Sequence, residues 1–141
     1  MIAYFDTSAV VPLIIEEATS ETCRRLWNEA TRVASSRLVY PETRAALARA
    51  VRMGRMTISQ LDSAIDDLDS LMDQVDVIEI SPGIAHAGGE LAQRFGLRGY
   101  DAVHLAAGLA MNDDDVVLVT GDRDLAAAAA AAGIATVLTT R

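Results

Sequence analysis

The stretch VVLVTGD, residues 116–122, decides the fold that this 141-residue chain is expected to adopt. Five residues dominated by branched aliphatic side chains predict a short buried strand, and Gly121 gives the backbone room to turn before Asp122. The chain opens in the same way, because the strand-like Ile2–Phe5 is followed directly by Asp6. In an open parallel sheet, ligands bind beyond the carboxyl ends of the strands. An acidic residue at the end of two strands therefore indicates a parallel α/β sheet with a functional edge.

Short β-branched runs alternate with longer periodic segments along the whole chain, which predicts a single α/β domain over residues 1–141. The predicted strands are Ile2–Phe5, Arg32–Ser35, Val75–Ile80, Val116–Thr120 and Ile134–Leu138. Hydrophobic residues make up 51% of the chain, which is ample for one core. We therefore expect a folded globule with a central parallel sheet.

Capping residues mark the ends of the predicted helices. Ser20 caps a helix that runs to about Ala30, and Thr57 with Gln60 forms a capping box for a helix that ends near Asp73. The other predicted boundaries are a cap and first-turn proline at Ser81-Pro82, an end near Gly96, starts near Tyr100 and Asp122, and a stop at Gly133. These signals place a helix in most of the intervals between strands.

The composition limits where the protein works. Its apolar runs are too short for a membrane span, since the longest candidate, Ala9–Ile15, is broken by Pro12. The opening residues lack the basic region and cleavage site of an export signal. Cys23 is the only cysteine, which excludes an internal disulfide and fits a reducing compartment. We therefore expect a cytoplasmic protein that does not enter a membrane.

The net charge of −8 argues against a generic nucleic-acid binder, because affinity for a polyanion normally comes from Lys and Arg. Two considerations weaken this objection. Bound metal would neutralise part of the negative charge, and all 12 basic residues are arginines, which pair with phosphate in a bidentate way. The charge also suits a basic partner.

Four distant carboxylates, Asp6, Glu42, Asp101 and Asp122, are predicted to meet at one edge of the sheet. Asp6 and Asp122 follow strands, while Glu42 and Asp101 lie in the first turns of helices that begin on the same side. Each of them alone is adequately explained as a helix cap or as a complement to a helix dipole. Their shared edge is what indicates a catalytic site.

Four crowded acids repel one another unless cations bind between them. Carboxylate oxygens suit Mg²⁺ or Mn²⁺, and such ions activate water and stabilise charge on a phosphodiester. Asp124 is a candidate further ligand or a helix cap, and the hydroxyls of Ser8 and Thr120 are candidates for holding water near the site. The residues thus predict metal-dependent phosphate chemistry.

Several other polar residues have simpler interpretations. His104 lies one turn after Asp101, and packing beside the sheet is favoured over a role in the site. His86 is interpreted as structural, and Asp113-Asp114-Asp115 as a solvated turn at the opposite edge. Three arginines near the helix of Glu42 suit either an RNA backbone or a plain surface role: Arg37, Arg44 and Arg55.

Four segments contain the predicted site residues: Tyr4-Phe5-Asp6-Thr7-Ser8-Ala9, Pro41-Glu42, Gly99-Tyr100-Asp101-Ala102-Val103-His104-Leu105-Ala106 and Thr120-Gly121-Asp122-Arg123-Asp124-Leu125. In these segments the chain resembles the PIN-domain nucleases, and more narrowly the VapC toxins of bacterial VapBC toxin–antitoxin pairs. Together the four segments span the chain from end to end. By motif, Asp6, Glu42, Asp101 and Asp122 match the family's acidic quartet, and Asp124 matches a second acid that some members carry.

The resemblance implies a three-layer α/β/α sandwich, Mg²⁺- or Mn²⁺-dependent endoribonuclease activity, a homodimer, and neutralisation by a VapB-type antitoxin whose basic side chain enters the acidic pocket. The nearest alternative is a PIN-domain nuclease in housekeeping RNA processing, which would have the same site. A receiver or haloacid-dehalogenase-like phosphatase is disfavoured, because those folds use a lysine and this chain has none. A non-catalytic module whose acidic cleft docks a basic peptide is the remaining alternative.

Overall fold

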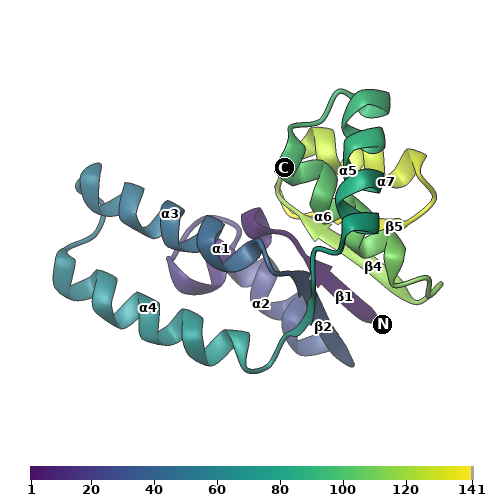
Figure 1. Cartoon of the computed structure of the whole chain (residues 1–141). Helices are drawn as coiled ribbons and strands as arrows, with labels where there is room; N and C mark the ends of the chain where they lie inside the picture. Colours follow the sequence, from purple (N-terminus) through teal and green to yellow (C-terminus); the bar gives the residue numbers. More distant parts are fainter. Residues whose placement is uncertain (141) are drawn as a thin grey trace.

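The computed structural model describes residues 1–140, and its centre is a five-stranded parallel sheet (Figure 1). The strands are β1 (Ile2–Phe5), β2 (Arg32–Ser36), β3 (Asp76–Ile78), β4 (Val116–Thr120) and β5 (Ala135–Leu138). They lie in the order β3-β2-β1-β4-β5, and each of the four pairings is parallel. The chain builds outward from β1 on one side and then returns to add β4 on the other. The switch point where ligands bind in such sheets therefore lies between the ends of β1 and β4.

Seven helices occur within residues 1–140. They are α1 (Thr7–Ile14), α2 (Ser20–Glu29), α3 (Val39–Arg52), α4 (Ile58–Met72), α5 (Pro82–Phe95), α6 (Gly99–Ala110) and α7 (Arg123–Ala131). None of these helices combines the length and apolar character that crossing a membrane requires.

The helices form two layers that cover opposite faces of the sheet. Successive side chains of a strand point to opposite faces, so Tyr4 packs in one buried cluster and Phe5 in the other. The Tyr4 cluster includes Leu105 of α6 and Leu125 of α7, with α5 packed against it. The Phe5 cluster draws its members from α1 to α4, including Leu68 of α4. The predicted three-layer α/β/α sandwich with a central parallel sheet is confirmed.

Most predicted boundaries agree with the structure. Thr57 and Gln60 form the predicted capping box of α4, the Ser81 side chain caps α5, and Gly96 ends α5 with a φ of 67°. β1 and β4 have the predicted bounds. β3 is shorter than the predicted Val75–Ile80, because it is an edge strand that pairs with β2 through three residues only.

The predicted cap at Ser20 is wrong. The N-cap of α2 is Thr19, which makes no side-chain capping bond. Ser20 is instead fully buried, and its hydroxyl donates to the carbonyl oxygen of Pro12 at 2.6 Å. That carbonyl lies near the end of α1, where intrahelical partners run out. Ser20 therefore ties two helices together.

Candidate active site

One pocket of about 490 Å³ collects the four carboxylates that the sequence placed along one edge of the sheet. Asp6 caps α1 directly after β1, and Asp122 caps α7 two residues after β4. Glu42 and Asp101 lie in the first turns of α3 and α6. All four line the pocket at the carboxyl ends of the strands. The fold thus brings together carboxylates that are far apart in the sequence, since Asp6 and Asp122 are separated by 116 residues (from 6 to 122).

Asp6 is the most enclosed of the four, with 2% of its surface exposed. Its Oδ1 accepts hydrogen bonds from the Ser8 hydroxyl at 2.7 Å and the Ala9 N–H at 3.1 Å, and its Oδ2 accepts one from the Thr120 hydroxyl at 2.7 Å. Burial raises the pKa of Asp6, although these hydrogen bonds oppose the rise. The carboxylate is thus held rigidly at a cost in free energy.

Ser8 and Thr120 lie next to the site, as the sequence indicated, and their hydroxyl protons are directed at Asp6. Their oxygens also accept backbone N–H groups, from Gly121 to Ser8 at 2.7 Å and from Asp122 to Thr120 at 3.0 Å. The two hydroxyls therefore join the end of β4 to the Asp6 carboxylate. They fix the geometry between the first and last acids of the site.

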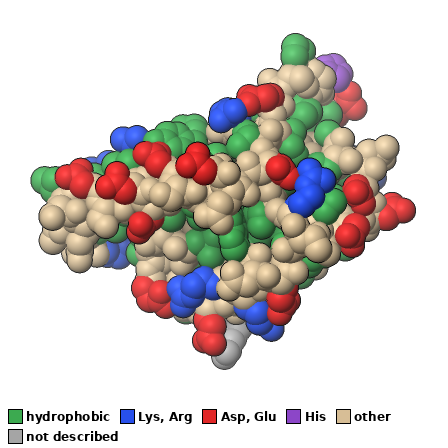
Figure 2. Space-filling model, turned by 90° about the horizontal axis from the view of Figure 1, so that it is seen from below, with side chains coloured by type: hydrophobic (Ala, Val, Ile, Leu, Met, Phe, Trp, Pro, Cys, Tyr) green, Lys and Arg blue, Asp and Glu red, His purple; other side chains and the backbone are tan. Residues whose placement is uncertain are grey.

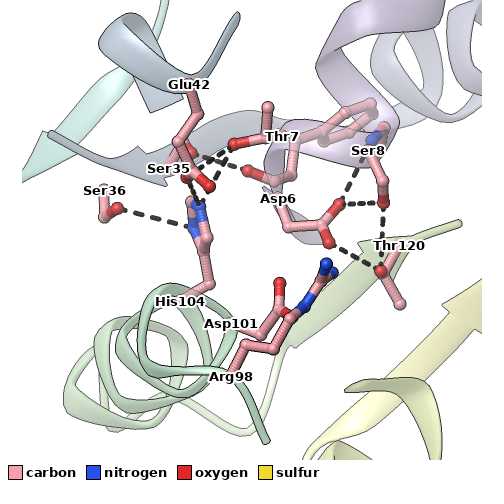
Figure 3. Close-up of polar contacts among 12 residues, drawn as sticks. Asp6, Thr7, Ser8, Ser35, Ser36, Glu42, Arg98, Asp101, His104 and Thr120 are labelled. Carbon is pink, nitrogen blue, oxygen red and sulfur yellow. Dashed lines mark hydrogen bonds and ion pairs between the residues drawn. The ribbon is translucent and has the colours of Figure 1, made fainter. Parts of the chain in front are cut away.

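Glu42 is held by two donors on the opposite side of the pocket (Figure 3). The Thr7 hydroxyl donates to Glu42 Oε1 at 2.8 Å, and His104 Nε2 lies 2.8 Å from the same oxygen. Burial alone would raise the pKa of Glu42, but the hydrogen bond and charge of His104, the Thr7 bond and the charge of Arg98 outweigh it and lower the pKa. Glu42 is therefore ionised at neutral pH and accepts hydrogen bonds only.

His104 has a closer connection to the site than its sequence position indicated. Since the Glu42 carboxylate only accepts, His104 Nε2 carries the proton and donates to it. The other ring nitrogen, Nδ1, lies 2.8 Å from the Tyr4 hydroxyl, which donates to it when the imidazole is neutral. His104 is 1% exposed, so it packs beside the sheet as expected and also orients a carboxylate of the pocket. The spacing of three residues from Asp101 on a helix was the available signal.

Arg98 is a second residue of the site that sequence reasoning missed. It precedes α6 and pairs through Nε with Asp101 Oδ2 at 2.9 Å and through Nη2 with Asp122 Oδ2 at 3.4 Å. Burial raises the pKa of Asp101, the nearby charges of Asp122 and Glu42 add to the rise, and Arg98 opposes it. One guanidinium thus bridges two of the four acids.

Comparison with known proteins places this arrangement in a family. The family model for the PIN domain matches residues 3–131 of the chain. The chain belongs to the PIN-domain family. It is 41% identical over 132 residues to ribonuclease VapC49 of Mycobacterium tuberculosis, a match that covers 94% of this chain and 92% of the relative.

Solved PIN-domain structures share the fold. The crystal structure of VapC20 from Mycobacterium tuberculosis, a toxin that cleaves the sarcin–ricin loop, has a TM-score of 0.73 and 23% identity, and the match covers 96% of this chain and 98% of that chain. A toxin–antitoxin complex from Klebsiella pneumoniae has a TM-score of 0.67 and 20% identity, covering 99% and 98%. At these identities the likeness concerns the fold.

Two groups of candidate residues lie outside the pocket that the four carboxylates line. Asp124 is exposed and lines a separate hollow with Phe95, so the structure does not bring it to the quartet. Arg37 forms an ion pair with Glu79, and Arg44 donates to the Tyr40 hydroxyl at 3.0 Å. Arg55 follows α3 in a turn and does not line the pocket. None of these three arginines lines the acidic pocket.

The pocket that the four carboxylates line offers carboxylate oxygens as metal ligands, a set that suits Mg²⁺ or Mn²⁺ better than Zn²⁺. Both nitrogens of His104 are already engaged, by Glu42 and Tyr4. Within residues 1–140, no three acidic, histidine or cysteine side chains stand close enough together to hold one ion as they are placed. The donors thus fit a hard cation in kind, and binding requires the carboxylates to turn toward it.

Proposed function

We propose that this chain is an endoribonuclease that requires Mg²⁺ or Mn²⁺ and acts as the toxin of a type II toxin–antitoxin pair. The observation that carries the proposal is the 41% identity to a ribonuclease over 94% of the chain, in a protein whose four carboxylates line one pocket. The four residues that would hold the metal are Asp6, Glu42, Asp101 and Asp122. When bound, the metal would supply Lewis-acid chemistry, which lowers the pKa of water and offsets charge on a phosphodiester.

The chain's own residues prepare the pocket for this chemistry. Ser8 and Thr120 hold the Asp6 carboxylate from both oxygens, and Thr7 and His104 hold Oε1 of Glu42. Oε2 of Glu42 accepts no hydrogen bond from residues 1–140 and remains available to a ligand. A carboxylate fixed before the reaction needs little reorganisation during it, which favours catalysis.

The overall charge makes binding of RNA depend on the pocket. Figure 2 shows carboxylates spread over the face that is seen there, with arginines scattered between them. Since the net charge is −8, a general attraction to RNA is weak, and affinity must come from bound metal and from arginine near the site. We therefore expect cleavage of a particular exposed RNA segment rather than indiscriminate degradation.

The test is an RNA cleavage assay on the full chain freed of antitoxin. Mg²⁺ or Mn²⁺ should support cleavage, EDTA should abolish it, and Asp6→Asn should reduce it by about 100-fold or more, because removing one group that acts on the transition state commonly costs about 2.7–4 kcal/mol. Asp113→Asn is the matched control, since this acid lies in an exposed loop outside the pocket. Cleavage that persists both in EDTA and in Asp6→Asn would refute the proposal.

We also propose a small antitoxin partner and a homodimer. The fold shared with a toxin–antitoxin complex supports the first, and the acidic pocket suits a basic side chain from such a partner. Expression of the chain alone should arrest bacterial growth, and co-expression with the adjacent small open reading frame should relieve the arrest. Light scattering on the purified chain measures the oligomeric state. Absence of growth arrest from an active nuclease would favour RNA processing instead.

A further inference from the structure

Arg98 lies at the mouth of the pocket with an anchored backbone and an exposed side chain. Its carbonyl oxygen accepts the N–H of Ala102 at 3.0 Å, which anchors the residue at the start of α6. The side chain is 64% exposed. In Figure 3 it runs beside Asp101 and points its guanidinium toward the pocket that Asp6 lines. The guanidinium also lies 4.9 Å from the centre of the Tyr100 ring.

The ion pairs of Arg98 engage carboxylate oxygens of two residues that would hold the metal ion. Both contacts end on Oδ2 atoms, one on Asp101 and one on Asp122. Ion pairs that involve an exposed side chain contribute little to stability and are screened by salt. A divalent cation carries twice the charge of a guanidinium and can therefore replace it at these oxygens. Two ligands that share a site weaken each other's binding by the same factor.

We propose that Arg98 is an exchangeable counter-ion of the pocket: it neutralises Asp101 and Asp122 before metal binds, and on metal binding it moves to a phosphate of the RNA. This inference rests on the proposed ribonuclease function. It explains why the carboxylates do not stand around a common point, since two of them are turned toward Arg98. It also supplies a positive group for the substrate in a strongly acidic chain.

The chemistry of arginine suits the second position. A guanidinium binds phosphate oxygens through two parallel hydrogen bonds, which a lysine does not match. Among the pocket-lining residues within 1–140, Arg98 is the one arginine. A released Arg98 keeps the face of Tyr100 within reach, and cation–π contact stabilises a guanidinium that is directed outward. RNA lying across the pocket would therefore come within reach of this side chain.

The first measurement is Mn²⁺ affinity, taken by isothermal titration or by electron paramagnetic resonance on full-length protein stripped of metal. Arg98→Gln should bind Mn²⁺ about three- to tenfold more tightly than the wild type, which corresponds to about 0.7–1.4 kcal/mol. Arg94→Gln removes the same charge from the last turn of α5 outside the pocket, and its affinity should stay within about 1.5-fold of the wild type. Equal or weaker binding by Arg98→Gln would overturn the inference.

The second measurement is steady-state cleavage of RNA at saturating Mn²⁺. Arg98→Gln should raise KM for RNA by about fivefold or more while it tightens metal binding, because it removes a charged donor that would pair with a phosphate of the RNA. Arg98→Lys should recover only part of this loss. An unchanged KM would overturn the role in RNA binding. If neither the wild type nor Arg98→Gln binds Mn²⁺, the metal-dependent function itself fails, and this outcome differs from a failure of the exchange.

Discussion

Replacing Asp6 by asparagine should stabilise the fold while it strongly reduces cleavage. Asp6 is 2% exposed, and burial raises its pKa. A raised carboxyl pKa means that the ionised form is less stable in the folded protein than in the unfolded chain. Asparagine keeps the shape and removes the charge. Its carbonyl can accept from the Ser8 hydroxyl and the Ala9 N–H, and its amide can donate to the Thr120 oxygen, with rotation of the hydroxyls.

The expected gain is the difference between two opposing effects. Burying an ionised carboxylate costs several kcal/mol. Against this, each of the three hydrogen bonds to Asp6 is about 1 kcal/mol more stabilising when the acceptor is charged than when it is neutral. Because the raised pKa shows that the cost of burial is larger, we expect a net gain of about 1–2 kcal/mol in the free energy of unfolding. For a domain of this size, that corresponds to about 2–8 °C in Tm.

The assay is thermal unfolding in EDTA over a range of pH. The advantage of Asp6→Asn should be largest at neutral pH and should shrink as the pH falls through the raised pKa of Asp6, because the wild type then gains the same neutral group. The stability advantage of Asp6→Asn should vanish when the pH is near or below 3.8, the ordinary pKa of an aspartate. Added Mn²⁺ should raise Tm of the wild type and leave Asp6→Asn unchanged.

Asp62→Asn is the matched control for this experiment. Asp62 is exposed on α4, so its substitution should change the free energy of unfolding by less than about 0.5 kcal/mol. An Asp6→Asn protein that is no more stable than the wild type at neutral pH in EDTA would refute the reasoning. So would a gain in stability that is the same at pH 4 and pH 7.5.

Two further pairs of substitutions test the support of the site and of the fold. His104→Leu removes the donor to Glu42 and should lower cleavage by about 10- to 100-fold, whereas His104→Gln, which keeps an N–H near the former Nε2, should lose less than about fivefold in the same assay. Gly88→Ala should destabilise the protein by about 1–2 kcal/mol in urea unfolding, because its Cβ would lie 3.1 Å from Val103 Cγ2. Gly89→Ala meets no atom within 4 Å and should stabilise by about 0.5–1 kcal/mol. A loss for His104→Gln as large as for His104→Leu, or equal effects at the two glycines, would contradict these accounts.

The sheet could be predicted because its signals are local. β1 and β4 are neighbours in the middle of the sheet and define the functional edge, and each is a short, mostly apolar run followed within two residues by a carboxylate. The capping box of α4 is equally local, since Thr57 and Gln60 lie three residues apart. Ser20 misled the prediction because a serine near a helix start has the same appearance whether its hydroxyl caps that helix or reaches back to Pro12. Only the packing of α2 against α1 decides between the two.

The grouping of the four carboxylates could be predicted from topology, but their partners could not. A parallel sheet with known strand ends places Asp6 and Asp122 on the same edge without any knowledge of side-chain positions. The bond between His104 and Glu42 joins residues from α6 and α3 and depends on how the layers meet over the end of the sheet. Asp124 shows the converse: its motif position matches the family, yet its place on α7 turns it toward Phe95 and away from the pocket.

Arg98 shows that the charge pairing in the pocket cannot be predicted from the number of charged residues alone. Its pairing with Asp101 follows from a spacing of three residues at a helix start, which is visible in the sequence. Its contact with Asp122 arises only because β4 ends beside the start of α6. Burial and the charges of Asp122 and Glu42 raise the pKa of Asp101, and the same arginine opposes this rise while it contacts two of the four carboxylates. On the proposed exchange, a metal would bind only as the guanidinium leaves the carboxylates, so the affinity for Mn²⁺ would depend on Arg98 as well as on the number of carboxylates.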